Sequence, residues 1–181
     1  MKRIFLLSML VLVSAALFAQ RKTTTSAVIA FDASTSIDNL PKAENKTAIA
    51  ALDTKTGLVQ VEAAVKNFAF ANPRIQDHFN NASWMNSDAF PKFTFNGKID
   101  DLSKVNFGKD GTYAISVTGD LTIKGVAKPL TVPGTIVIRG DIIDASAEFS
   151  IKLPDYNMTG GSFDSGKVSK EPKITVTAEL K

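Results

Sequence analysis

The chain has 181 residues, of which 44% are hydrophobic and 22% are charged, and it contains no cysteine. This length suits one domain, and the lack of cysteine excludes disulfide bonds, a lipoprotein anchor and thiolate metal ligands. The formal net charge of +3 falls by two to +1 without Lys2 and Arg3. Since no basic cluster is interleaved with aromatic residues, nucleic acid is not an expected partner.

The start of the chain has the pattern of a secretory signal peptide. Lys2 and Arg3 precede an apolar run from Ile4 to Ala19, which is the order of a basic n-region and a hydrophobic h-region. The run is short for a membrane span. The sequence therefore predicts a signal peptide at 1–19 and one domain at 20–181, in a periplasmic or secreted protein that contacts a membrane only transiently.

Alternating apolar and polar residues after this leader predict about eight strands. Residues 39–45 (NLPKAEN) instead indicate a turn or a short linker, while 54–57 (TKTG) predict a hairpin turn. The predicted strands are 26–32, 47–53, 58–68, 92–100, 111–125, 129–140, 141–153 and 172–181. Most have one apolar and one polar face, which is typical of antiparallel sheets with one solvated side. The pattern predicts an all-β sandwich or barrel.

The alternation stops between residues 71 and 90. Asn72 as a cap and Pro73 in the first turn predict the start of a helix, and Ile75 and Phe79 continue at helical spacing. Ser83 or Ser87 is a candidate cap for a second short turn. We therefore expect a short helical insertion near residues 73–88.

Two short motifs fit ordinary turns and loops better than binding functions. Residues 161–168 (GSFDSGKV) match a phosphate-binding loop only in part, because Val168 replaces Ser or Thr and a predicted strand follows instead of a helix. A Gly/Ser-rich loop is expected there, with a lid over a barrel mouth as a hypothesis. The RGD at 139–141 lies between two alternating runs, where Gly140 and Asp141 suit a tight hairpin turn.

Catalytic and metal-binding patterns are weak in this chain. A single histidine, His78, cannot build a multi-histidine metal site. The neighbouring Asp77 points to a different face of a helix, and no G-x-S-x-G elbow occurs. The sequence predicts no enzyme activity, no metal and no cofactor, and His78 is expected to make a structural or head-group contact.

Two longer stretches resemble the YceI-like family of exported bacterial proteins. They are 76–99 (QDHFNNASWMNSDAFPKFTFNGKI) and 113–133 (YAISVTGDLTIKGVAKPLTVP), and 149–158 (FSIKLPDYNM) resembles a later strand of that family. The motif residues are Asp77, His78, Phe79, Trp84, Phe90, Pro91, Thr94, Phe95, Gly119, Asp120, Leu121, Thr122, Ile123, Gly125, Lys128, Pro129, Asp155 and Tyr156.

The resemblance implies an eight-stranded antiparallel lipocalin-like barrel. It also implies an amphipathic lipid ligand with a long tail, of the polyisoprenoid, isoprenoid quinone or fatty amide type, held for transport, storage or sequestration, and it suggests a homodimer. The first two strands lack the family's His-Gly and Gly-x-Phe signatures. This departure keeps a second hypothesis open, in which the barrel is filled and the protein is a structural or interaction module.

The candidate ligand-binding residues combine the inward-facing parity of the strands with the aromatic residues of the insertion. The same side chains would also build a ligand-free core, so parity does not separate an open interior from a filled one. The predicted lining and mouth are Val61, Val65, Phe79, Trp84, Phe93, Phe95, Tyr113, Ile115, Val117, Ile136, Phe149 and Ile151.

Overall fold

The computed structural model describes residues 21–181, so the predicted signal peptide at 1–19 lies outside the described residues. The strands are β1 (Arg21–Asp32), β2 (Lys42–Asp53), β3 (Leu58–Ala64), β4 (Ala69–Phe70), β5 (Lys92–Ile99), β6 (Gly111–Ile123), β7 (Val126–Arg139), β8 (Ile142–Ser150) and β9 (Lys173–Leu180). The helices are α2 (Pro73–Asn80), α3 (Gly161–Asp164) and three 3₁₀ turns, η1 (Val65–Asn67), η2 (Leu102–Lys104) and η3 (Leu153–Tyr156).

All strands form one antiparallel sheet in the order β1-β9-β8-β7-β6-β5-β3-β2-β4. A further pairing of β1 with β2 closes eight of these strands into a barrel. The two-residue β4 pairs only with β2 and stands outside the ring. The prediction of an eight-stranded antiparallel barrel is therefore confirmed, with one short strand added.

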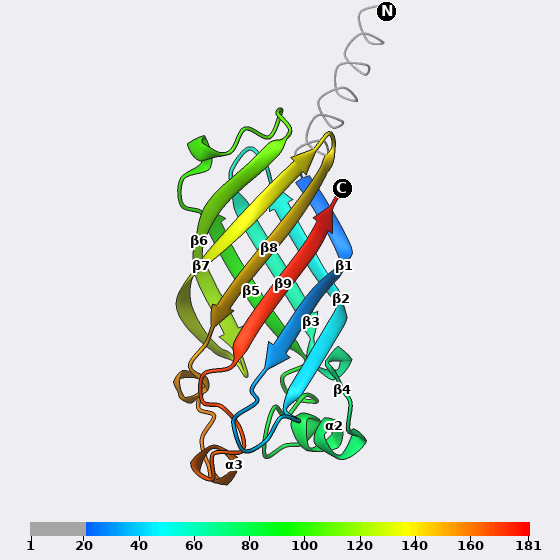
Figure 1. The fold of residues 1–181 in the computed structure, drawn as a ribbon, viewed down its shortest axis with the longest axis vertical. Coiled ribbons are helices and arrows are strands. Elements are labelled where there is room, and N and C mark those ends of the chain that lie inside the picture. The colour runs from blue at the N-terminus through cyan, green and yellow to red at the C-terminus, as the bar shows by residue number, and fades with distance from the viewer. Residues whose placement is uncertain (1–20) are drawn as a thin grey trace, which may run out of the picture.

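Long connections gather at one end of the barrel. Figure 1 shows α2, α3 and β4 together at the lower end, away from the end where β9 finishes. The two strand pairs with the tightest turns are β6–β7, through Lys124 and Gly125, and β7–β8, through Gly140 and Asp141. Lys124, Gly125 and Gly140 have positive φ angles of 50°, 74° and 56°, as two-residue hairpin turns require. The predicted hairpin at 140–141 is confirmed.

β2 begins earlier than the sequence predicts, because 42–45 belong to the strand and not to a linker. The polar Asn45 is fully buried and its side chain is satisfied. Its Nδ2 donates to the Ala64 carbonyl at 3.0 Å, and its Oδ1 accepts from the Thr47 amide at 2.8 Å. A buried polar group that keeps its hydrogen bonds is tolerated in a strand, which the linker prediction overlooked.

The helical insertion begins as predicted and ends differently. The Asn72 side chain accepts from the Arg74 amide at 2.9 Å, and Pro73 occupies the first turn of α2. After Asn80 the chain continues as turns with no second helix before β5. Ser83 and Ser87 do not cap a helix. The Ser83 amide donates to Asn81 Oδ1 at 2.7 Å, which closes a local turn instead.

Residues 151–172 are more ordered than the predicted Gly/Ser loop. β8 ends at Ser150, and η3 and α3 follow within this connection. Phe163 in α3 is 5% exposed, which anchors the segment to the core. Among residues 21–181, no helix has the length and apolar character needed to cross a membrane.

Candidate ligand-binding cavity

The barrel interior contains an apolar cavity of about 210 Å³. Its walls come from every strand except β4, together with side chains of the connections at the α2 end. Among the described residues that line the cavity, none carries a charge, and the polar ones are Thr94, Thr135 and Ser146. An engineered apolar cavity of roughly 150 Å³ takes up benzene, so this space is large enough to hold an apolar group.

The cavity is long compared with its volume. Ile115 and Ile123 both line it and lie eight residues apart on β6. At about 3.3 Å per residue this separation is about 26 Å along the strand, or about 20 Å along the axis for a strand tilted by about 40°. A narrow apolar chain fits this shape better than a bulky ring system does.

Nine of the twelve predicted lining residues face the cavity. They are Val61, Phe79, Phe93, Phe95, Ile115, Val117, Ile136, Phe149 and Ile151. Strand parity brings eight of them together, and Phe79 reaches the space from α2. Whether these side chains bind a ligand stays a prediction.

Val65, Trp84 and Tyr113 lie away from the cavity wall. Val65 falls in η1 and is fully buried in the core, next to other core residues instead of the cavity. Tyr113 keeps the inward parity of β6, but its hydroxyl donates to the Lys109 carbonyl at 3.0 Å and joins the packing at the η2 end. Trp84 lies behind Phe79, at a ring distance of 6.3 Å.

Sequence reasoning left out lining residues of two kinds. Ile29 of β1, Leu52 of β2 and Val176 of β9 have the apolar parity of their strands, so the alternation that selected the other residues could have found them. Leu153 also lines the cavity and continues the alternation predicted for 141–153, although β8 ends at Ser150. Met85 lines the cavity from a connection without strand periodicity, and no sequence pattern pointed to it.

A cluster of aromatic rings covers the cavity at the α2 end. The Phe79 ring lies 6.2 Å from Phe68 and 4.9 Å from Phe70, and Phe68 lies 5.7 Å from Phe93. Phe68 and Phe79 are each 4% exposed and line the cavity. The strand aromatics and the insertion aromatics therefore form one continuous apolar wall.

Trp84 connects this cluster to the β8–β9 connection. Its ring stacks on Phe163 with centroids 5.5 Å apart and an interplanar angle of 11°. The His78 ring lies 5.7 Å from the Trp84 ring, and His78 is exposed to solvent. Whether His78 has a structural role or contacts a head group stays a prediction.

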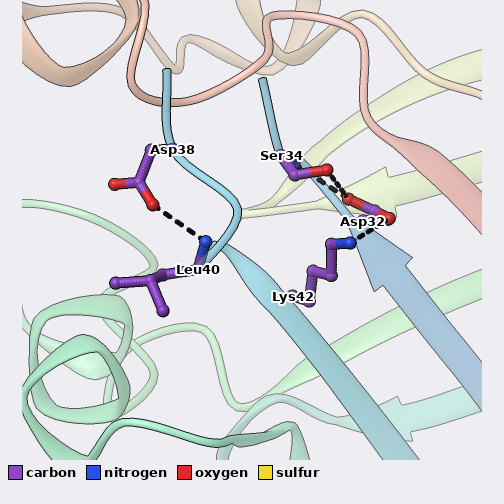
Figure 2. A network of polar contacts seen from close by, with 5 residues as sticks. All are labelled: Asp32, Ser34, Asp38, Leu40 and Lys42. Carbon is purple, nitrogen blue, oxygen red and sulfur yellow. Dashed lines mark hydrogen bonds and ion pairs between the residues drawn. The ribbon is translucent and has the colours of Figure 1, made fainter. Parts of the chain in front are cut away.

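The β1–β2 connection at the same end is held by its own side chains. Figure 2 shows the Asp32 carboxylate accepting from the Ser34 amide at 2.9 Å and pairing with Lys42 at 3.3 Å, while Asp38 accepts from the Leu40 amide. Burial acts to raise the pKa of Asp32, but the hydrogen bonds from Ser34 and Lys42 outweigh it and hold the pKa below its ordinary value. The Leu40 side chain is left 54% exposed.

The chemistry of the cavity is that of apolar binding. The lining contains no histidine, aspartate or glutamate, and within residues 21–181 no group of three such side chains is placed to hold a metal ion. Bringing a charge into such an interior without a partner is costly. The arrangement can take up an uncharged chain and leaves a polar head group at a barrel end.

Curated relatives match part of this chain. Protein YceI of Shigella flexneri and Protein YceI of Escherichia coli O157:H7 are each 31% identical to it over 108 residues, which is 56% of this chain. The match spans about half, 51%, of the length of these relatives.

Solved structures share the fold at low sequence identity. A polyisoprenoid binding domain from Saccharophagus degradans superposes with a TM-score of 0.75 at 12% identity, over 90% of this chain and 98% of that chain. BcnA of Burkholderia cenocepacia gives 0.67 at 22% identity, over 86% and 96%. The Campylobacter jejuni YCEI protein gives 0.55 at 19% identity, over 79% and 84%.

The YceI-like domain model matches residues 13–180, which is nearly the whole chain. The closed barrel, the motif residues around Phe79 and Gly119, and this match agree with one another. The protein belongs to the YceI-like family.

Proposed function

We propose that this protein binds an amphipathic lipid with a long tail, of the polyisoprenoid, isoprenoid quinone or fatty amide type, and carries, stores or sequesters it. The observation that carries the proposal is the long, uncharged cavity of about 210 Å³ inside a closed barrel. The fold is shared with a domain described as polyisoprenoid-binding. No catalytic role for the cavity is proposed, because its lining offers no general acid or base.

Tail burial supplies the affinity in this proposal. Each methylene removed from water contributes about 0.8 kcal/mol, so several methylenes along the cavity outweigh much of the cost of ordering the chain. The head group stays at a barrel end, since the described lining offers it no charged partner. This separation is the reason that an amphipathic ligand fits better than a ligand that is polar throughout.

Extraction of the purified protein tests the proposal directly. Protein produced in a bacterial host and purified without added lipid is extracted with organic solvent, and the extract is analysed by mass spectrometry. One class of long-chain lipid in near-stoichiometric amount is the expected result. The delipidated protein should then gain thermal stability on addition of farnesol, because a ligand that binds the folded state shifts unfolding by mass action.

The filled-barrel alternative predicts the opposite outcome in both measurements. If no lipid co-purifies and farnesol leaves the melting temperature unchanged, lipid binding is wrong and a structural or interaction module is the better description. Crosslinking in the native host would then be used to identify a protein partner.

We also propose that the protein is exported and forms a homodimer. The leader pattern at 1–19 supports export. Cell fractionation and the mass of the mature chain test export, and a chain that begins at Met1 and stays in the cytoplasm contradicts export.

Sedimentation equilibrium of the mature protein tests the homodimer, and a mass equal to one chain contradicts it.

A further inference from the structure

Two long connections lie over the α2 end of the barrel (Figure 1). We call residues 154–169 the flap and residues 71–91 the helical excursion. The ends of the flap are joined at its base, where the Leu153 amide donates to the Lys170 carbonyl at 2.9 Å. A surface segment of this size with adjoining ends is an Ω-loop, a type of loop that is often functional.

The flap is bonded mainly to itself. The Phe163 amide donates to the Gly160 carbonyl at 3.0 Å, the Val168 amide donates to the Ser162 carbonyl at 3.1 Å, and Lys170 pairs with Asp164 at 3.3 Å. A backbone bond from Ser169 to Ala33 ties the C-terminal side of the flap to the β1–β2 connection. The bonds of Phe163 and Val168 lie within the flap and would survive a movement of the flap as a unit about its base.

The helical excursion is a second self-bonded unit. The Met85 amide donates to the Phe79 carbonyl and the Ser87 amide to the Asn80 carbonyl, both at 3.1 Å. At its base the Val65 amide donates to the Pro91 carbonyl at 2.9 Å. Separation from the flap would therefore cost the excursion none of these hydrogen bonds.

Trp84 and Phe163, which we call the closing pair, join the two units. Their rings stack at 5.5 Å, and Trp84 lies 6.3 Å from Phe79, which lines the cavity. Leu153, at the base of the flap, lines the cavity as well. Only the Phe79 side chain therefore separates Trp84 from the cavity. The closing pair joins two units whose hydrogen bonds lie mainly within each unit.

The opposite end of the barrel is closed in a different way. Val105, Ile138 and Ile143 are buried there beyond the cavity lining. Thr23 and Lys181 exchange two backbone bonds, of 3.0 and 3.1 Å. Opening that end would break backbone pairing between strands as well as core packing. Opening the α2 end would break side-chain packing, including that of Phe163, but would leave the strand pairing of the barrel intact.

We propose that the lipid enters and leaves the barrel at the α2 end, and that separation of Trp84 from Phe163 opens this entrance. The proposal rests on the proposed function. In this proposal Trp84, which lies outside the cavity, controls how fast the lipid enters and leaves and has little effect on the binding affinity. Replacement of the closing pair should therefore speed entry and release together and change the equilibrium little.

Stopped-flow binding of cis-parinaric acid, a fluorescent fatty acid, to the delipidated full-length mature protein tests the proposal. The variants are Phe163→Leu, which keeps an apolar side chain but removes the stack, and Trp84→Phe. Phe107→Leu is the matched control, because Phe107 packs against the core from the connection at the η2 end. Phe163→Leu should raise the entry and release rates about three- to tenfold, the range expected for loss of an aromatic pair, and Trp84→Phe, which keeps a smaller ring, should raise both rates by a smaller factor. The dissociation constant should stay within about twofold, and the control should leave both rates within about twofold.

Each outcome has a definite consequence. Unchanged rates in both test variants, or a larger rate increase in Phe107→Leu than in Phe163→Leu, overturn the entrance and leave lipid binding intact. Failure of the wild-type protein to take up the probe overturns lipid binding and the entrance together. If Phe163→Leu does not fold, Trp84→Phe carries the test.

Wild-type protein gives an independent readout. Trp84 is the only tryptophan in the chain, so its emission reports on the closing pair without labelling. Uptake of non-fluorescent farnesol should change Trp84 emission at the rate of binding. Emission that stays constant during uptake contradicts the opening of this end.

Discussion

Gly119 of β6 lies directly opposite Gly97 of β5, where the two strand backbones come unusually close. A Cβ at Gly119 would lie 2.3 Å from both the Asn96 oxygen and the Gly97 Cα. Both are backbone atoms, so no side chain could rotate away to relieve the contact. This close approach gives a physical reason for a glycine in the Gly-Asp-Leu-Thr-Ile stretch of the second motif.

Gly119→Ala should therefore lower the free energy of unfolding by about 3 kcal/mol, at the upper end of the cost of overpacking. Gly108→Ala is the control, because a Cβ there meets only the Asn106 side chain, at 3.5 Å. Urea unfolding followed by circular dichroism measures both variants. Equal urea midpoints for the two variants would show that β5 and β6 can move apart to accept a Cβ at residue 119 without loss of stability.

Tyr156 provides a test at high pH. Burial raises the pKa of this phenol, and the neighbouring Asp155 carboxylate raises it further. An unfolded tyrosine loses its proton near pH 10. Above this pH the proton loss stabilises the unfolded state, while Tyr156 in the folded protein is still protonated. Folding stability should fall as the pH rises through about 10 toward the higher pKa of the folded protein.

The ultraviolet absorbance of tyrosinate, taken as the difference between wild type and Tyr156→Phe, should show this delayed ionisation. Tyr156→Phe should also flatten the loss of stability above about pH 10. Ionisation of Tyr156 at the ordinary pKa would contradict its burial in η3.

At the scale of elements, the β1–β2 connection depends on Asp32. The pKa of Asp32 is held down in the folded protein, so its stabilising effect is present above the unfolded pKa of about 3.9 and is lost as the pH falls through the folded value. Asp32→Ala should remove the same contacts at neutral pH. The protection of the Ser34 amide, which donates to Asp32, against hydrogen exchange should fall in both cases, relative to the intrinsic exchange rate at the same pH.

Asp88→Ala is the control for this prediction. Asp88 pairs with Lys66 on the surface at 2.6 Å, and its side chain is 85% exposed. Its removal should leave exchange in 33–41 unchanged. Equal exchange at Ser34 in wild type and Asp32→Ala would mean that Asp32 does not order the connection.

Elements with strong periodicity could be predicted from the sequence, and those fixed by tertiary contacts could not. β6, β7 and the start of α2 follow from alternation, turn glycines and the Asn72 cap. The early start of β2 depends on the hydrogen bond from Asn45 to Ala64, 19 residues away. A local pattern contains no information about such a partner.

The same difference explains the candidate site. Strand parity placed Phe93, Phe95 and Phe149 correctly on the inner face. It also placed Val65 in the interior, where Val65 is fully buried in η1 but does not line the cavity. Parity alone could not show that Trp84 contacts Phe163, since the two residues come from connections far apart in the sequence.

At the scale of the whole molecule, the cavity volume limits how long a tail the barrel can bury. Ala147 of β8 lines the cavity, and Ala147→Leu would fill space for about three methylene groups. At about 0.8 kcal/mol each, the affinity for cis-parinaric acid should fall on the order of fiftyfold. The ligand-free protein should keep its melting temperature, because the added side chain occupies a void.

Glu148→Leu is the matched control, since residue 148 is exposed on the same strand. It should leave the affinity within about twofold. If Ala147→Leu binds the probe as tightly as wild type, the tail does not occupy this cavity. Equilibrium titration and thermal unfolding of both variants give the two measurements.

The strand order has a consequence for biogenesis. β9 follows every other strand in the sequence, yet it lies between β1 and β8 and pairs with both. While the ribosome still holds the residues of β9, β1 and β8 therefore present unpaired edges, which favour association with other chains. Closure must wait for a contact between segments at opposite ends of the domain, which is slow to form. The newly made chain should therefore need protection from aggregation until Leu180 has emerged.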